Sequence, residues 1–240
     1  MFGVGGGILL VPFLVLVRKV PQKRAQATSL VLVAMAAAAG AVRYALSDDV
    51  AWLPGAVITV GGLVGAWLGA HLVQRSPNAV LQAAFGAVLC VAGVRMLWPT
   101  ATTVVAADVL PAMSGTLLVG YVAAGLGMGL LSALFGIGGG ILLVPILVTA
   151  FGYSQHLAAG TSLAVMVPIA LLGAIRLTRP GLTRWREGAR LGLGAMAGAL
   201  VGASIAQALS DSILQIDFGL LLLAVGAQMA LKSWRGRRGG

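Results

Sequence analysis

Two contiguous glycine clusters, each followed by a proline, are the part of this sequence best suited to binding chemistry. They are Gly5-Gly6-Gly7 before Pro12 and Gly138-Gly139-Gly140 before Pro145. Each glycine disfavours a helix by about 1 kcal/mol relative to alanine, and proline removes a helical hydrogen bond. We therefore expect a short, interrupted helix after each cluster, whose unpaired N-terminal amides can bind an anion. Close helix packing is the alternative role, although packing calls for small residues four apart rather than a contiguous run.

Paired hydroxyl residues recur near the start of two apolar stretches, as Thr28-Ser29 and as Thr161-Ser162. Hydroxyl groups can donate hydrogen bonds to anion oxygens without the cost of burying a full charge. Helix capping or bonding to a nearby carbonyl is the alternative role. Together with the glycines, these residues form the predicted substrate-binding set: Gly5, Gly6, Gly7, Thr28, Ser29, Gly138, Gly139, Gly140, Thr161 and Ser162.

Three of the charged residues within apolar stretches are candidates for a role in transport. Arg43 and Arg176 occupy equivalent places toward the ends of two such stretches. They are predicted either to extend to the lipid headgroups or to act as entrance charges that attract anions, one at each membrane face. Asp217 lies near the start of another stretch, where it either complements a helix N-terminus or is a proton-coupling group.

The composition excludes most classes of soluble protein. Of the 240 residues, 59% are hydrophobic and 9% are charged, and the mean hydropathy is +1.00; soluble domains have about 25% charged residues. The net charge of +10 would suggest nucleic-acid binding in a soluble chain, but the basic residues here lie between or at the ends of apolar stretches. We expect an all-α polytopic membrane protein whose partner is the lipid bilayer and not nucleic acid. Cys90 and two distant histidines, His71 and His156, predict neither a metal site nor a cofactor.

Seven apolar stretches are long enough to cross a bilayer core of about 30 Å, which takes roughly 20 residues. They are 25–46, 51–73, 78–98, 111–134, 157–177, 188–209 and 212–232. Two shorter stretches, 8–17 and 141–151, each follow a glycine cluster and are too short for ordinary spans. Polar turns separate the stretches, for example at Ser47-Asp48-Asp49 and at Arg179-Pro180-Gly181.

The chain repeats itself at an offset of 133 residues without a gap. The segment 2–12 recurs as 135–145, and Gly65 and Gly69 match Gly198 and Gly202. We therefore predict two transmembrane copies of about four to five helical segments each. The predicted boundaries are 1–98 for the first copy, 99–110 for a connection, 111–232 for the second copy and 233–240 for a basic cytoplasmic tail.

Equivalent loops of the two copies have opposite charge character. Basic residues crowd 18–24 in the first copy, whereas the counterpart 151–156 has no Lys or Arg; conversely, 47–49 is acidic and the loop at 178–187 is basic. Because positive loops stay in the cytoplasm, the copies are predicted to insert in opposite orientations, as in inverted-repeat transporters. On this assignment the loops at 18–24, 74–77 and 178–187 and the C-terminus are cytoplasmic, and the membrane is the cell inner membrane.

The second copy starts with a full stretch, 111–134, that has no counterpart in the first copy. Inverted symmetry predicts an equivalent helix upstream of the first glycine cluster. We therefore expect the first copy to lack its first helix, which a misassigned start or a shortened chain would explain.

The duplicated glycine and Val-Pro motif resembles the TauE/SafE family of membrane permeases, also called the sulfite exporter or toluene-sulfonate uptake permease family. The matching residues are Gly3-x-Gly5-Gly6-Gly7-x4-Val11-Pro12 with Thr28-Ser29-Leu30, and Gly136-x-Gly138-Gly139-Gly140-x4-Val144-Pro145 with Thr161-Ser162-Leu163. The resemblance covers essentially the whole chain, and two copies at one offset make it specific. It implies a permease for a sulfur-containing anion such as sulfite, sulfoacetate or a sulfonate, and the absent first helix departs from the family pattern.

The expected function is secondary transport of such a small anion by alternating access between the two copies. A negative membrane potential favours anion exit by about 2.3 kcal/mol per charge per 100 mV, and intramembrane acids that could couple uptake are scarce, so export is favoured over uptake. A proton-coupled uptake permease and an anion channel are the alternatives. An intramembrane enzyme and a scaffold subunit are less favoured, and a homo-oligomer stays open.

Overall fold

The computed structural model describes residues 20–75, 90–91, 93–94, 97, 115–136, 138–179 and 181–238. Within these residues the chain forms seven named helices: α2 (Gln22–Ala45), α3 (Trp52–Arg75), α5 (Gly115–Phe135), α6 (Gly140–Phe151), α7 (Gln155–Thr178), α8 (Trp185–Ala208) and α9 (Asp211–Arg238). The first glycine cluster (Gly5, Gly6 and Gly7), the 99–110 connection and most of the 78–98 stretch lie outside the described residues. The all-α prediction is confirmed for the part that the structure describes.

Helix lengths agree with the apolar stretches because each stretch ends at a polar turn or a glycine. Five of the described helices, α2, α3, α5, α7 and α8, are long and apolar enough to cross a membrane. The short stretch predicted at 141–151 is α6, which begins at Gly140 and continues through Pro145 to Phe151. The expectation of a multi-pass helical membrane protein is therefore confirmed.

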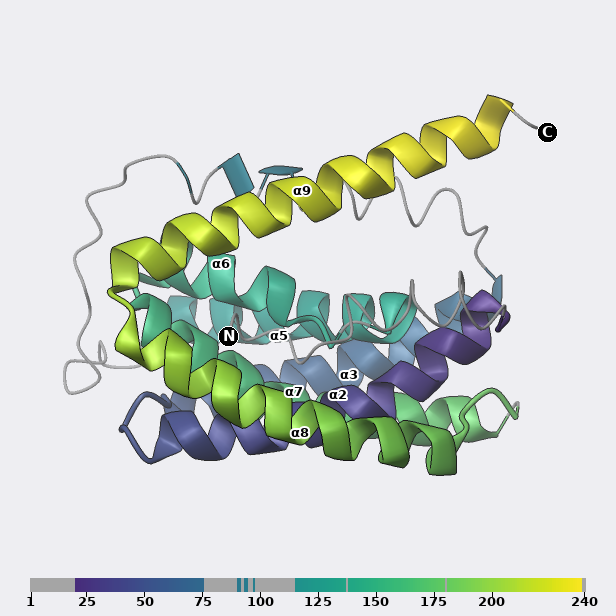
Figure 1. Ribbon diagram of the computed structural model, residues 1–240, viewed down its shortest axis with the longest axis horizontal. Coiled ribbons are helices and arrows are strands. Elements are labelled where there is room, and N and C mark those ends of the chain that lie inside the picture. The colour runs from purple at the N-terminus through teal and green to yellow at the C-terminus, as the bar shows by residue number, and fades with distance from the viewer. Residues whose placement is uncertain are drawn as a thin grey trace.

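The helices lie side by side in a bundle, with α9 along one side (Figure 1). Helix α2 packs on α7 and α8, α3 packs on α5 and α7, and the short α6 packs on α7 and α5. Burial differs sharply between helices of similar hydropathy: 83% of the most apolar 18 residues of α2 are buried, against 17% of those of α8. The interior of the described bundle is therefore centred on α2 and α7.

The two copies make reciprocal contacts at matching positions. A Cβ atom on Gly40 of α2 would lie 2.9 Å from Leu163 of α7, and one on Gly173 of α7 would lie 3.0 Å from Leu30 of α2. These pairs exchange under the 133-residue offset, and they join the first half of each helix to the second half of the other. Helices α2 and α7 are thus antiparallel and related by a local two-fold axis. This relation supports inverted copies, whereas their orientation across a membrane and the predicted domain boundaries stay predictions.

Helices α3 and α5 meet along a seam of glycines that brings their backbones into contact. Cβ atoms on Gly61, Gly65 and Gly69 of α3 would overlap or press on the backbone carbonyls of Val122, Leu126 and Leu130. From the other side, Cβ atoms on Gly125 and Gly129 would overlap the carbonyls of Ile58 and Gly62. Small residues four apart allow this close approach, which replaces the hydrophobic effect as a source of helix association in lipid.

The loops of the described bundle are sorted by charge between its two ends. One end contains the α2–α3 loop, the start of α7 and the α8–α9 corner, and its acidic residues are Asp48, Asp49 and Asp211. The opposite end contains the start of α2 and the α7–α8 loop, joined by a hydrogen bond between Thr28 and Arg184. Its basic residues are Lys23, Arg24, Arg179, Arg184 and Arg186. The structure therefore groups the loops as the charge pattern predicts, and the assignment of the basic end to the cytoplasm stays a prediction.

Candidate functional site

The second glycine cluster breaks the chain between α5 and α6. Gly136, Gly138 and Gly139 have φ angles of +67°, +86° and +75°, a region that favours glycine because it has no Cβ atom. Helix α5 ends one residue before this segment and α6 begins at Gly140. The interrupted helix predicted for the second copy is thus confirmed, and the equivalent prediction for the first copy lies outside the described residues.

Three glycines, Gly136, Gly138 and Gly139, called the glycine loop below, are pressed against three helices. A Cβ atom on Gly136 would lie 2.6 Å from the carbonyl oxygen of Gln26 in α2, and one on Gly139 would lie 2.6 Å from that of Met128 in α5. One on Gly138 would lie 2.5 Å from the sulfur of Met166 in α7. These three glycines therefore fit only without side chains, and all three are buried inside the bundle.

The N-terminus of α6 offers backbone amides in this buried place. The amides of Leu142 and Leu143 donate to the Gly139 carbonyl at 3.1 and 3.3 Å. Gly140 and Ile141 are both buried, and the first amides of an α-helix have no acceptor within that helix. A helix N-terminus carries a partial positive charge, so an anion placed here would receive both hydrogen bonds and a favourable field.

Ser132 places a hydroxyl group on the face of α5 that contacts the glycine loop. It is 1% exposed, and its Oγ has no hydrogen-bond partner among the described residues. It lies one turn after Met128, on the face of α5 that touches Gly139, and its carbonyl accepts from the Gly136 amide at 2.9 Å. An unpaired hydroxyl in an apolar interior is costly, so this group is a candidate ligand contact. The repeat comparison misses Ser132 because its counterpart would precede residue 1.

The predicted hydroxyl pairs make contacts between elements. The Ser29 hydroxyl lies 2.8 Å from the Gln26 carbonyl and 2.5 Å from the Gly136 carbonyl, so it holds the glycine loop. Thr161 Oγ1 accepts from the Ala51 amide at 2.9 Å, and Thr28 Oγ1 accepts from the Arg184 amide at 3.3 Å. Each threonine therefore lies at the start of the other copy's next helix.

These threonine contacts exchange under the 133-residue offset, like the leucine contacts between α2 and α7. They satisfy a backbone amide that no helical carbonyl can reach, and they leave the hydroxyl proton available to a ligand. Ser162 is fully buried beside Thr161. A substrate contact for Thr28, Ser29, Thr161 and Ser162 stays a prediction.

Removing the Ser29 hydroxyl should loosen the glycine loop. In Ser29→Ala the buried Gly136 carbonyl loses its partner from α2, and an unsatisfied buried acceptor costs about 1–3 kcal/mol. We expect a lower melting temperature in detergent than for Ser212→Ala, a change at an exposed serine of α9. Equal melting temperatures for these two variants would show that the hydroxyl does not hold the loop.

The two predicted entrance arginines lie at opposite ends of the bundle. Arg43 donates from Nη1 to Ser47 at 2.8 Å and from Nε to Ser204 at 3.3 Å, at the acidic end. Arg176 is exposed, and its guanidinium carbon lies 5.6 Å from the ring centre of Trp67. Both positions are compatible with lipid-headgroup contact and with attraction of anions, and their role stays a prediction.

Asp217, the predicted proton-coupling residue, is half-buried on α9. Within the described residues, no ion pair or hydrogen bond of its carboxylate is recorded. Its role therefore also stays a prediction.

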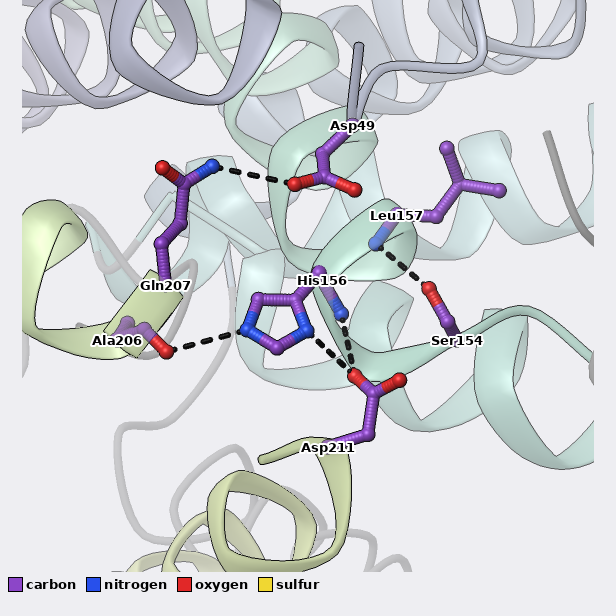
Figure 2. Close-up of polar contacts among 7 residues, drawn as sticks. All are labelled: Asp49, Ser154, His156, Leu157, Ala206, Gln207 and Asp211. Carbon is purple, nitrogen blue, oxygen red and sulfur yellow. Dashed lines mark hydrogen bonds and ion pairs between the residues drawn. The ribbon is translucent and has the colours of Figure 1, made fainter. Parts of the chain in front are cut away.

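A polar network at the acidic end was not predicted from the sequence. The Gln207 amide nitrogen donates to Asp49 Oδ2 at 3.1 Å, and Ser47 donates to the Gln207 amide oxygen at 3.0 Å. His156 contacts Asp211 and the carbonyl of Ala206 (Figure 2). The side chains form two neighbouring groups, one around Gln207 and one made of His156 and Asp211. We call both together the end cluster: Arg43, Ser47, Asp49, His156, Ser204, Gln207 and Asp211.

Asp49 is a partly buried acid of the end cluster. Burial raises the pKa of its carboxyl, and the charges of Asp211 and Asp48 raise that pKa further. A positive charge on His156 and the Gln207 hydrogen bond act in the opposite direction. The end cluster draws on three separate segments of the chain, 43–49, 156 and 204–211, which explains why no local sequence motif points to it.

Comparison with known proteins places this architecture in a family. The family model described as Sulfite exporter TauE/SafE matches residues 1–96 and 121–240. The chain belongs to the TauE/SafE family. The resemblance expected from the duplicated motif is thereby confirmed. No solved structure matches the chain.

The curated relatives of this TauE/SafE family member are named as transporters. A "Probable membrane transporter protein" of Xylella fastidiosa (strain Temecula1) is 30% identical over 237 residues, which cover 98% of this chain and 90% of the relative. The "Probable membrane transporter protein YunE" of Bacillus subtilis is 23% identical over 253 residues, covering 95% and 91%. One from Methanocaldococcus jannaschii, "Probable membrane transporter protein MJ0441", is 29% identical over 181 residues, covering 73% and 65%. The chain is therefore a multi-pass protein of a membrane transporter family.

Proposed function

We propose that this protein is a secondary transporter of a small sulfur-containing anion, such as sulfite or an organosulfonate. The anion would bind at the N-terminus of α6, beside the glycine loop. The observation that carries the proposal is the unpaired, buried Ser132 hydroxyl, one turn after Met128, which contacts Gly139 at the buried start of α6. The description of the matched family, a sulfite exporter, supports the substrate class.

The chemistry of this site suits a ligand that must be released. The amides of Gly140 and Ile141 and the Ser132 hydroxyl are neutral hydrogen-bond donors. Neutral donors bind an oxyanion without the strong ion pair that a buried arginine would form. They also exclude a cation, because a helix N-terminus presents positive potential. A site of this kind favours small oxyanions and can give them up when the surrounding helices move.

Ser132→Ala should separate ligand binding from protein stability. The variant removes a buried hydroxyl that has no partner, so the melting temperature of the ligand-free protein should stay unchanged or rise. A hydrogen bond to a charged ligand is worth about 1.5–3 kcal/mol, so binding should weaken about 10- to 100-fold. Thermal shift and calorimetry with sulfite, thiosulfate, sulfoacetate and sulfate measure both effects.

The control for this experiment is Ser29→Ala, which should lower stability because Ser29 holds the glycine loop. If Ser132→Ala lowers stability without weakening the binding of any of these anions, the site is placed wrongly. If none of the four anions stabilises the natural protein, the proposed substrate class is wrong.

Export is the direction that we propose, because the membrane potential drives an anion outward without a coupling ion. Proton-coupled uptake is the second candidate, and the histidine–carboxylate contact of the end cluster is the observation that favours it. Reconstituted vesicles distinguish a carrier from a channel. Carrier transport saturates with substrate and shows counterflow of labelled sulfite, whereas flux through an anion channel shows no counterflow.

A further inference from the structure

The His156 ring lies between two hydrogen-bond acceptors. Its Nδ1 lies 2.6 Å from Asp211 Oδ1, and its Nε2 lies 3.1 Å from the carbonyl oxygen of Ala206. Figure 2 shows the ring between these two groups, with the His156 backbone amide also donating to Asp211 Oδ1 at 3.1 Å. The side chains of His156 and Asp211 are 17% and 45% exposed, so the pair is accessible to water from one side.

This arrangement holds one proton more than a neutral imidazole beside a carboxylate. A neutral imidazole has one N–H and one bare nitrogen, and a carboxylate can only accept. One of the two contacts would then bring two lone pairs together. Both contacts are hydrogen bonds only when the pair carries a second proton, which resides on the ring or is shared with the carboxyl group.

We infer that His156 and Asp211 form a proton-binding site that closes the acidic end of the bundle when it is protonated. The site joins three elements, because His156 is at the start of α7, Ala206 is in the last turn of α8, and Asp211 begins α9. Loss of the proton turns one contact from attractive to repulsive. That change weakens the attachment of the α8–α9 corner to α7.

Charged groups lie around His156 on other elements. Asp211 faces the ring from α9, and Asp49 lies close enough in the α2–α3 loop for their charges to interact. The positively charged Arg43 of α2 is directed to Ser47 and Ser204 instead. Because the closed arrangement binds one proton more than the released one, a fall in pH stabilises it and a rise in pH weakens it.

The same contacts connect proton binding to the other copy. Gln207 lies in the last turn of α8 beside Ala206, and it bridges Ser47 and Asp49 of the α2–α3 loop. Release of the α8–α9 corner would therefore also disturb the hydrogen bonds of Gln207 to the α2–α3 loop of the first copy. As a consequence for transport, which rests on the proposed function, proton binding at this end would favour the state that is open at the opposite end.

The site itself can be tested without a substrate. We expect the melting temperature of the purified full-length protein to fall by about 2–4 °C more between pH 6 and pH 8 than that of His156→Asn or Asp211→Asn. The matched control is His71→Asn, because His71 is the other histidine and is exposed beside Trp67. This control should keep the pH dependence of the natural protein. If His156→Asn and Asp211→Asn keep it as well, no proton site exists there.

The transport consequence is tested separately by counterflow of labelled sulfite in proteoliposomes. In the natural protein the rate should change with the external pH over this range, and Asp211→Asn should flatten that dependence at least threefold. An unchanged pH profile in Asp211→Asn would overturn the link to transport. If the natural protein shows no sulfite counterflow at all, the proposed function fails for sulfite, and the melting experiment still decides the proton site.

Discussion

Replacement of Gly129 by valine is expected to leave little or no folded protein that can be extracted from membranes. A Cβ atom at this position of α5 would overlap the carbonyl of Gly62 in α3 and lie 2.8 Å from the Ala66 amide nitrogen. Both are backbone atoms, so no side chain can rotate to make room. The two helices would have to separate along the whole glycine seam, because Gly125 and the facing glycines of α3 share it.

The milder Gly129→Ala should still fold in part. Overpacking of a close-packed site costs about 3 kcal/mol at the upper end of the usual range, which corresponds to a melting temperature about 6–12 °C lower. The fraction of monodisperse protein after detergent extraction, followed by thermal unfolding, measures both variants.

Gly127 provides the matched control for this prediction. It lies on the same helix two residues earlier, and a Cβ atom there would meet nothing within 4 Å among the described residues. Alanine also has a better helix propensity than glycine. Gly127→Ala and Gly127→Val should therefore be extracted as efficiently as the natural protein. If the Gly127 variants are as damaging as the Gly129 variants, the glycines of α5 serve something other than contact with α3.

The helices themselves were predictable because their signals are local. Apolar stretches of sufficient length, separated by polar turns, predict spans such as α2 and α7. The run of glycines before Ile141 predicts the break before α6, because no side chain fixes the backbone there. Even the sorting of loops between the two ends follows from charge, as the acidic turn at 47–49 shows.

The contacts of the candidate site were not predictable in the same way. The offset shows that Thr28 and Thr161 are equivalent, but not that each contacts the start of the other copy's next helix. Ser132 is a single serine in an apolar helix, and only its burial without a partner marks it. The end cluster joins Asp49, His156 and Asp211, which are far apart in the sequence and come together only because α2 and α7 are antiparallel.

Alanine in place of Gly139 is expected to abolish anion binding in any protein that still folds. Gly139 caps α6 with a φ angle of +75°, a conformation that costs an L-residue about 1–2 kcal/mol. The new Cβ atom would also lie 2.6 Å from the Met128 carbonyl and 2.7 Å from its side chain. Relief of that overlap moves the α6 N-terminus, and with it the amides of Gly140 and Ile141 that we propose bind the anion.

Gly181 is the control that separates the backbone cost of a positive φ angle from the steric overlap with Met128. Its φ angle is +71°, close to that of Gly139, but a Cβ atom there would meet nothing within 4 Å in the part of the chain that the structure describes. Gly181→Ala should therefore lose only the backbone cost of about 1–2 kcal/mol and bind anions normally. The further loss of stability in Gly139→Ala then measures the packing of the glycine loop against α5. Equal melting temperatures and equal anion affinities for the two variants would mean that the loop has room to move, and that bare backbone is not needed at this place.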